Sequence, residues 1–258
     1  MMRPDVIDLR KFYHTRLGVA VRKALVRKIR HIWPDISNFR LLGLGYATPY
    51  LYPFRSETER AIALMPAQQG VIHWPHGGPS LVGLCDEAGL PLADSSIDRV
   101  ILVHGLENTR VADDMLQEIW RILTSSGKLL VVVPGRRGMW SRLENTPFGY
   151  GYPYSDRQLR RVLQTNMFTY GEVHGALYFP PSGTRINLRL AQFLENLGEK
   201  WWPLFSGVRF IEAEKQIYAI PEVPQKRKRL RPVIAPAARP IGANTTGAEK
   251  LNRSRIDK

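Results

Sequence analysis

Short apolar runs alternate with helix-spaced apolar positions through the middle of the chain. Runs expected to form strands lie at 40–44, 61–65, 80–85, 99–104, 128–133, 172–179 and 208–218. Two of them, RVILVH and KLLVVV, are almost unbroken Val, Ile and Leu, which is typical of strands buried on both faces of a parallel sheet. Apolar residues at three- and four-residue steps predict helices at 111–123, 155–164 and 186–197. This alternation predicts an α/β, doubly wound sheet of seven strands, mostly parallel, with the last strand antiparallel.

The chain begins with a basic amphipathic stretch, 9–33, which is expected to form two helical pieces around Gly18 and to end at Pro34. Such a stretch can lie on a membrane, dock on nucleic acid or cover the core of its own domain. The last interpretation is preferred, because Lys and Arg stems extend readily over apolar surface. Residues 1–39 are therefore taken as a basic helical segment that precedes a main domain at 40–220.

The last part of the chain, 221–258, is rich in Pro, poor in large apolar residues and without periodicity. It cannot bury enough apolar surface to offset the entropy lost on folding, so it is expected to be a disordered basic tail. Its KRKR run at 226–229 is interpreted as part of a solubilising tail, with contact to a polyanion or an acidic partner as the alternative.

Charge is distributed unevenly along the 258 residues, whose net charge is +14. Residues 3–40 and 221–258 each hold ten Lys and Arg against three acidic residues, whereas 41–220 is neutral. The chemistry of the middle segment therefore does not require a polyanion. An apolar share of 44% excludes disorder of the whole chain, and no apolar run reaches the roughly 18 residues of a membrane span.

Cysteine and histidine usage restricts the chemistry further. The single cysteine, Cys85, excludes an internal disulfide and a zinc site built from thiolates. His73 and His76 lie three residues apart, but no neighbouring Cys or carboxylate completes a ligand set, so no metal site is expected. The N-terminus has no apolar run of the kind that a signal peptide contains. Together these features predict a cytoplasmic protein.

Residues 86–133 carry a series of motifs at regular spacing. DEAGLP occupies 86–91, SIDRV occupies 96–100, and EIWRIL at 118–123 is followed by SGK. The series resembles the second half of class I S-adenosylmethionine-dependent methyltransferases of the type 11 kind. In that family a D-A-E-x-L-P turn, a Ser-Phe-Asp lead and an E-x-x-R-V-L-K-P-G-G segment follow one another. A weaker resemblance extends from 40 to about 218.

The resemblance implies S-adenosylmethionine as cofactor, bound beyond the carboxyl ends of the strands at the switch point between the first and fourth. The family's glycine-rich loop corresponds to GLGYATP at 43–49. Gly45 keeps the first glycine, the later two are replaced, and Gly43 stands where the family has an acid. Gly45 and Tyr46 are expected to lie against the methionine moiety, and Gly43 belongs to the same predicted cofactor loop.

Further cofactor contacts are implied at the second and third strand ends. Met65 stands where the family has the carboxylate for the ribose hydroxyls, and it is expected to touch the adenosine through apolar contact. Gln68 or Gln69 is then available for the hydroxyls, although an amide binds them less strongly than a carboxylate. Asp86 is expected to accept from the adenine amino group, and Glu87 to donate its backbone N–H to the ring.

Two more features are candidates for the acceptor side. His104, at the end of the fourth predicted strand, is a candidate cofactor contact and general base, with a structural loop histidine as the alternative. The aromatic loop 146–154, TPFGYGYPY, is a candidate lid over an apolar acceptor pocket or a partner surface. No catalytic residue is assigned, because positioning alone supplies much of the rate of methyl transfer from a sulfonium.

Three functions follow from these observations. The favoured one is transfer of a methyl group from S-adenosylmethionine to a small-molecule or protein acceptor. The second is a methyltransferase-fold protein without cofactor that acts as a scaffold or regulatory subunit, since acids are missing at the first two strand ends. The third is a nucleic-acid methyltransferase that uses the basic ends, although the chain lacks the N/D-P-P-Y/F and Pro-Cys motifs of two base-methylating classes. A protein partner is expected to bind through the aromatic loop or the basic ends, if one exists.

Overall fold

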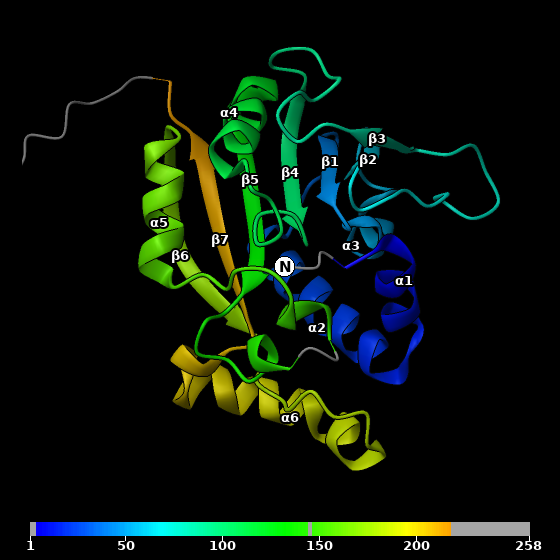
Figure 1. The fold of residues 1–258 in the computed structure, drawn as a ribbon, viewed down its shortest axis with the longest axis vertical. Coiled ribbons are helices and arrows are strands. Elements are labelled where there is room, and N and C mark those ends of the chain that lie inside the picture. Colours follow the sequence, from blue (N-terminus) through cyan, green and yellow to red (C-terminus); the bar gives the residue numbers. More distant parts are fainter. Residues whose placement is uncertain (1–3, 144–145, 218–258) are drawn as a thin grey trace, which may run out of the picture. The chain divides into compact units, whose positions relative to one another are not determined.

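The computed structural model describes residues 4–143 and 146–217, so the predicted tail at 221–258 lies outside the described residues. A seven-stranded sheet forms its centre, in the order β3-β2-β1-β4-β5-β7-β6 (Figure 1). The strands are β1 Arg40–Gly45, β2 Arg60–Pro66, β3 Val82–Cys85, β4 Ile97–Val103, β5 Leu123–Pro134, β6 Phe168–Ala176 and β7 Val208–Lys215. β7 runs antiparallel to both of its neighbours, and the other adjacent pairs are parallel. The predicted mostly parallel sheet is confirmed.

Strand bounds differ most from the predicted ones in β5 and β6. β5 begins at Leu123, directly after the preceding helix, and Leu123 pairs with Ile97 of β4. Residues 125–127, expected to end that helix, therefore lie in a strand. β6 begins at Phe168, because its pairing with β7 begins there, opposite Lys215, and it ends at Ala176. The run 128–133 is buried between β4 and β7, as predicted.

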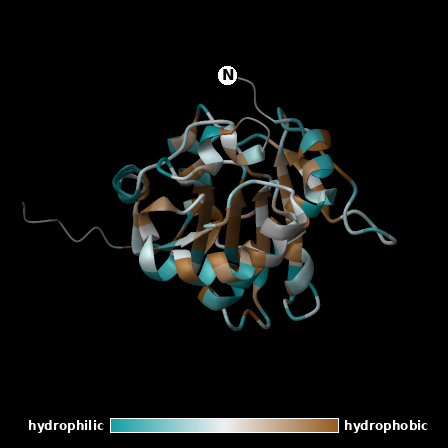
Figure 2. Cartoon of the chain, turned by 90° about the horizontal axis from the view of Figure 1, so that it is seen from below, coloured by the Kyte–Doolittle hydropathy of each residue, from teal (hydrophilic) through white to brown (hydrophobic). Residues whose placement is uncertain are grey.

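Helices cover both faces of the sheet. The helices are α1 Val6–His14, α2 Arg16–Ile32, α3 Thr48–Leu51, α4 Ala112–Ile122, α5 Asp156–Thr165 and α6 Arg185–Trp201. The core over one face contains side chains from α1, α2, α3 and α6, and the core over the other contains side chains from α4 and α5. Figure 2 shows the hydrophobic strands between helices whose outward positions are hydrophilic. Among the described residues, no helix is both long enough and apolar enough to cross a bilayer.

The N-terminal segment forms two helices, with the break at Thr15 instead of Gly18. The Thr15 hydroxyl caps α2 by accepting from the Gly18 backbone N–H at 3.0 Å. Gly18 is needed because a Cβ there would lie 2.1 Å from the Phe12 carbonyl oxygen, so the helices pack closely at this residue. The first turn of α1 lies against the loop after β2, where the Val6 N–H donates to the Gln69 carbonyl at 2.9 Å.

Candidate functional site

The turns after β1 and β4 interlock at the point where the strand order reverses. β1 ends at Gly45, whose φ of +78° favours glycine, and a Cβ there would lie 2.2 Å from the Val103 carbonyl oxygen. The next residue, Tyr46, donates its N–H to the same carbonyl at 2.9 Å. On the β4 side the chain turns at His104, which has a φ of +53°. His104 is thereby fixed beside the predicted cofactor loop.

Polar groups surround His104, whose side chain is fully buried. Its Nε2 lies 2.7 Å from the Tyr13 hydroxyl of α1, which lies 2.5 Å from the Tyr50 hydroxyl of α3. Its Nδ1 lies 3.4 Å from a carboxyl oxygen of Glu107, without the geometry of a hydrogen bond. Burial raises the pKa of both tyrosines well above the ordinary value of 10, so their hydroxyls stay protonated. A buried line of polar groups thus connects Glu107 through His104 to α1.

Aromatic rings enclose this line of polar groups. Tyr46 stacks on Tyr13, with ring centroids 5.6 Å apart and planes at 19°. Phe148, from the aromatic loop, lies 4.9 Å from the His104 ring. The same loop is held to the end of β4 by the Tyr152 N–H, which donates to the Glu107 carbonyl at 2.8 Å. The aromatic loop and α1 together keep the imidazole from solvent.

Several buried acceptors in this region lack donors. The atoms without a hydrogen-bond partner in the described part of the chain include Gln69 Oε1, both carboxyl oxygens of Glu107, Asn108 Oδ1 and His104 Nδ1. Gln69 also donates its amide to the His104 carbonyl at 3.2 Å, so its side chain points toward the end of β4. Buried acceptors without donors are rare and unfavourable. Because several of them lie close together at the end of β4, we infer a site where a ligand would supply the missing hydrogen-bond donors.

An open cavity of about 350 Å³ lies beside the two stacked tyrosines. It extends between α1, the turn after β1 and the loop that follows β2. Its lining combines basic and aromatic side chains, including Arg10, Tyr13, Arg22, Tyr46, His73 and Trp74. The site therefore has a solvent-accessible approach next to its buried polar groups.

Of the predicted cofactor loop, Gly45 and Tyr46 lie directly beside His104, while Gly43 is enclosed. A Cβ at Gly43 would lie 2.7 Å from both the Ala47 Cβ and a Leu51 side-chain carbon. The α3 side chains therefore occupy the room that the family's acid would need. The packing at this position therefore leaves no room for an acidic side chain.

The predicted contacts at the ends of β2 and β3 differ in exposure. Met65 is fully buried in the apolar core that also contains Trp74, and it pairs in register with Leu84 of β3. Asp86 is exposed, and its Oδ1 accepts from the Ala88 N–H at 3.0 Å. The Glu87 side chain is buried and accepts from the Thr109 hydroxyl at 2.5 Å. Their predicted roles toward a cofactor stay predictions.

Sequence reasoning missed Tyr13, Glu107 and Asn108 as members of the site. Glu107 and Asn108 carry a usable signal, since they follow the β4 run within four residues of His104. Tyr13 carries none, because only the path of α1 over the sheet edge brings its hydroxyl to His104.

The chain matches one family model, described as a methyltransferase domain, over residues 45–131. That range runs from the last residue of β1 into β5 and includes both interlocking turns. No curated protein matches the chain.

Solved structures share the fold at low sequence identity. A methyltransferase of Thermotoga maritima, described as a possible histamine N-methyltransferase, is 16% identical with a TM-score of 0.58, covering 82% of this chain and 96% of that one. A methyltransferase of Archaeoglobus fulgidus is 17% identical with a TM-score of 0.54, covering 80% and 96%. The [4+2]-cyclase SpnF is 16% identical with a TM-score of 0.51, covering 75% and 81%. At these identities the likeness shows the fold and leaves the reaction open.

The family domain and the fold imply S-adenosylmethionine as the cofactor. This molecule presents an ammonium group, ribose hydroxyls and an adenine amino group, all of them hydrogen-bond donors. The unpartnered acceptors of Gln69, Glu107 and Asn108 fit such a donor-rich ligand. Residues 45–131 thus match a methyltransferase domain, and the chain shares the fold of solved S-adenosylmethionine-dependent methyltransferases.

Proposed function

We propose that this protein transfers a methyl group from S-adenosylmethionine to a small-molecule or protein acceptor. The observation that carries the proposal is the group of buried, unpartnered acceptors beside the Gly45 turn, where the strand order reverses. In open α/β sheets, ligands bind at such a reversal, beyond the carboxyl ends of the strands. A donor-rich cofactor at this point would satisfy the acceptors.

The residues that would hold the cofactor differ in part from the family pattern. Glu107 would supply the negative charge for the ammonium group that Gly43 cannot supply. Gln69 would accept from the ribose hydroxyls in place of a carboxylate at Met65. Asp86 and the Glu87 backbone N–H keep their predicted roles toward the adenine. Gly45 and Tyr46 would lie against the methionine moiety.

When bound, the cofactor's sulfonium supplies a methyl group that is intrinsically reactive toward a nucleophile. The protein's part is then to orient the acceptor, exclude water and remove a proton where the acceptor carries one. His104 is the proposed proton acceptor. The Tyr13 hydroxyl, which lines the cavity and lies beside His104 Nε2, would take the acceptor's proton and pass its own to the imidazole, and Glu107 near Nδ1 would stabilise the imidazolium. Phe148 would exclude water from above the ring. The aromatic loop thereby acts as a lid.

A scaffold without cofactor is the first alternative, and the packed positions of Gly43 and Met65 support it. SpnF illustrates that the same fold occurs in a protein described as a cyclase. Nucleic-acid methylation through the basic ends is the second alternative. A neighbour from Haloferax volcanii, 15% identical with a TM-score of 0.50 over 80% of this chain and 91% of that one, is a putative methyltransferase in complex with the activator Trm112. By analogy, a protein partner at the aromatic loop or the basic ends stays part of the proposal, as does a cytoplasmic location.

Titration calorimetry with S-adenosylmethionine tests the proposal on the full chain. We expect binding by the wild type and an affinity about 10- to 100-fold lower for Glu107→Gln, because a charge-assisted contact contributes about 1.5–3 kcal/mol. Glu172→Gln makes the same chemical change at an exposed position of β6 and should bind like the wild type.

A second readout separates loss of binding from loss of folding. Without ligand, Glu107→Gln should raise the thermal unfolding midpoint, because it removes a buried carboxyl group that has no donor. A wild type that does not bind at millimolar cofactor would remove the enzyme proposal in favour of the scaffold. A folded Glu107→Gln variant with wild-type affinity would show that Glu107 does not face the cofactor.

A further inference from the structure

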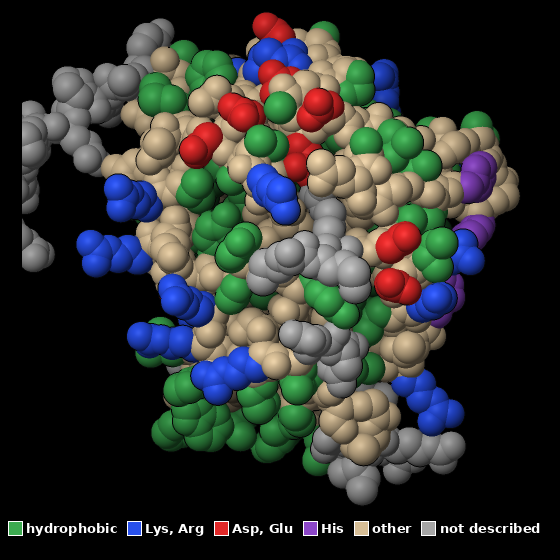
Figure 3. Space-filling view, in the orientation of Figure 1, with side chains coloured by type: hydrophobic (Ala, Val, Ile, Leu, Met, Phe, Trp, Pro, Cys, Tyr) green, Lys and Arg blue, Asp and Glu red, His purple; other side chains and the backbone are tan. Residues whose placement is uncertain are grey.

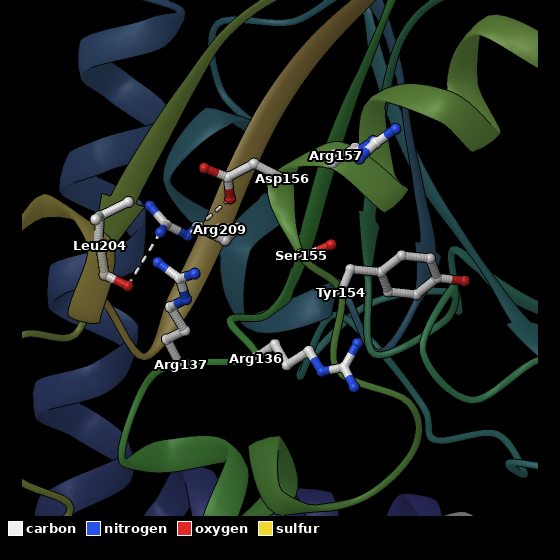
Figure 4. A pocket seen from close by; sticks show the side chains of 8 residues that line it. All are labelled: Arg136, Arg137, Tyr154, Ser155, Asp156, Arg157, Leu204 and Arg209. Atoms are coloured by element: carbon white, nitrogen blue, oxygen red, sulfur yellow. Dashed lines mark hydrogen bonds and ion pairs between the residues drawn. The ribbon is translucent and has the colours of Figure 1, made fainter. Parts of the chain in front are cut away.

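A second cavity, of about 550 Å³, opens where β5 ends, β7 begins and α5 starts (Figure 4). We call it the arginine pocket. Its lining residues are Arg136, Arg137, Tyr154, Ser155, Asp156, Arg157, Leu204 and Arg209. Four of the eight are arginines and one is a carboxylate, in a main domain that carries no net charge over 41–220. The pocket is therefore a concentrated positive site on an otherwise balanced domain.

One of these arginines is built into the fold. Arg209 lies on β7 and is only 7% exposed. Its Nε lies 3.1 Å from Asp156 Oδ1, and its Nη2 donates to the Leu204 carbonyl at 3.2 Å. Both contacts are drawn in Figure 4. Asp156 thus balances Arg209 and holds its guanidinium plane at the pocket wall.

Arg136 and Arg137 have no neighbouring carboxylate of the kind that Asp156 provides for Arg209 in the described part of the chain. Both are exposed, and neither pairs with a carboxylate in residues 4–143 and 146–217. Figure 4 shows that the Arg137 side chain extends from the segment after β5 toward Arg209 of β7, whereas the Arg136 side chain extends beneath Tyr154. Two neighbouring positive charges without a counterion repel each other, and an anion between them removes that repulsion.

The charge and shape of the lining favour a phosphate group over a carboxylate. A phosphate monoester carries close to two negative charges near neutral pH, which matches the two unbalanced arginines, and its oxygens accept guanidinium forks in pairs. α5 begins at the pocket with Ser155 as its capping residue, so its dipole adds positive potential. The cavity is larger than a phosphate ion needs, which leaves room for the organic part of an ester.

We propose that the arginine pocket binds the phosphate group of a ligand, held by Arg136, Arg137 and Arg209. The ligand is either a soluble phosphate ester or a phospholipid headgroup. The second source is considered because exposed apolar side chains adjoin the pocket beyond Leu204, including Trp202 and Phe205. Figure 3 shows hydrophobic side chains gathered in the same part of the surface, over α6. The proposal does not depend on methyl transfer.

Calorimetric titration of the full chain with inorganic phosphate at low ionic strength tests the shared chemistry. We expect millimolar or tighter binding by the wild type, weakened at least about tenfold in Arg136→Gln/Arg137→Gln. The matched control, Arg160→Gln/Arg161→Gln, removes two exposed arginines of α5 that do not line the pocket, and should stay within about twofold of wild type. Equal affinity in both double variants, or no phosphate binding by the wild type, would overturn the proposal.

Asp156→Asn gives a test that misfolding cannot mimic. Removing the carboxylate takes one negative charge away from the pocket beside Arg209, so phosphate should bind several-fold more tightly than to the wild type. Weaker binding by a folded Asp156→Asn variant would contradict the placement of the anion.

Two arms then separate the sources of phosphate. Glycerol 3-phosphate that binds more tightly than inorganic phosphate, with the same arginine dependence, identifies a soluble ester. Sedimentation with vesicles that contain phosphatidic acid, whose headgroup is a phosphate monoester, identifies a lipid headgroup if it falls in Arg136→Gln/Arg137→Gln but not in the control. If neither the ester nor the vesicles distinguish the two double variants, the arginine pocket is not a phosphate site.

Discussion

The ends of β2 and β4 lie one strand apart, on either side of β1, and they are built in opposite ways. Met65, the second-last residue of β2, is a fully buried thioether in an apolar core that also contains Trp74. His104 and Glu107, in the turn that follows β4, are equally buried but polar, and they include atoms that no described residue hydrogen-bonds. The family pattern places acids at the ends of the first two strands. Here the buried carboxyl group lies after β4 instead.

The fold can therefore keep the carboxyl-end edge of its sheet, where ligands bind, while the acidic side chain at that edge comes from a different strand end. Gly45 retains the tight turn against Val103, so the path of the backbone is preserved. Leu51 fills the place of the acid next to Gly43, which improves packing and removes a charge partner. Glu107 reaches the same edge from the adjacent strand end. Substitutions at these strand ends test whether their polar and apolar residues contribute to stability and cofactor binding as this comparison predicts.

The largest effect is expected for Met65→Glu, which makes the end of β2 resemble the family pattern. A carboxylate in this apolar core has no described donor, so we expect the free energy of unfolding to fall by about 3–5 kcal/mol. Met65→Leu conserves volume and should change it by less than about 1.5 kcal/mol. Urea denaturation measures both. A stable Met65→Glu variant that binds S-adenosylmethionine more tightly would instead show that the ribose reaches β2.

A half-buried carboxyl group, Glu195 of α6, differs from that of Glu107 because it has a hydrogen-bond donor. Its Oε1 accepts from the Tyr178 N–H at 2.7 Å. Burial raises the pKa of Glu195 to about 7, and the neighbouring Lys28 and Arg27 offset only part of that rise. Since this pKa lies above the ordinary 4.5, Glu195 contributes stability below about pH 4.5, and that contribution is lost as the pH rises through 7.

Glu195→Gln should remove this pH dependence. We expect the variant to match the wild type near pH 4.5 and to exceed its free energy of unfolding at pH 8 by up to roughly 3 kcal/mol. Denaturation of both proteins across this range measures the difference. A difference that does not change with pH would mean that folding does not raise the pKa of Glu195.

Much of the fold was predictable from the sequence, because buried parallel strands leave a strong local signal. The run 128–133 is apolar at almost every position, and it lies at the centre of the sheet. The start of β6 was not predictable, since Phe168–Gly171 lies in a strand only through pairing with β7. The break at Thr15 was missed because glycine is the stronger local signal, whereas here Gly18 serves close packing.

The candidate site was predictable only in part. Gly45 and His104 follow apolar runs directly, so the strand ends give their positions. Glu107 follows the same apolar run as His104, but a glutamate in a loop is usually exposed, and only the fold shows that this one is buried beside His104. Tyr13 lies ninety-one positions before its partner His104 in the sequence, so no local sequence pattern predicts their contact.

A smaller effect is expected at the end of β3, where the polar residue is exposed. Asp86→Ala should weaken S-adenosylmethionine binding about 10- to 100-fold if Asp86 accepts from the adenine amino group, which corresponds to about 1.5–3 kcal/mol. Asp86→Asn keeps an acceptor for the Ala88 N–H, so it separates the charge from the local turn. Calorimetry compares the three proteins. Unchanged affinity in a folded Asp86→Ala variant would leave the acceptors after β4 as the main cofactor contacts.

The smallest effect concerns the link from α1 to the end of β4. Tyr13→Phe keeps the ring that stacks on Tyr46 and removes the hydroxyl that lies near both His104 and Tyr50. Two buried polar groups then lose a partner, so we expect a loss of about 1–2 kcal/mol in the free energy of unfolding. Tyr46→Phe is the matched control, because no described residue hydrogen-bonds to the Tyr46 hydroxyl, and it should change stability by less than about 0.5 kcal/mol. Urea denaturation measures the loss in the free energy of unfolding of both variants. Equal losses would mean that the Tyr13 hydroxyl contributes nothing specific, so that ring packing alone holds α1 over the sheet edge. The line of polar groups from Glu107 would then end at His104.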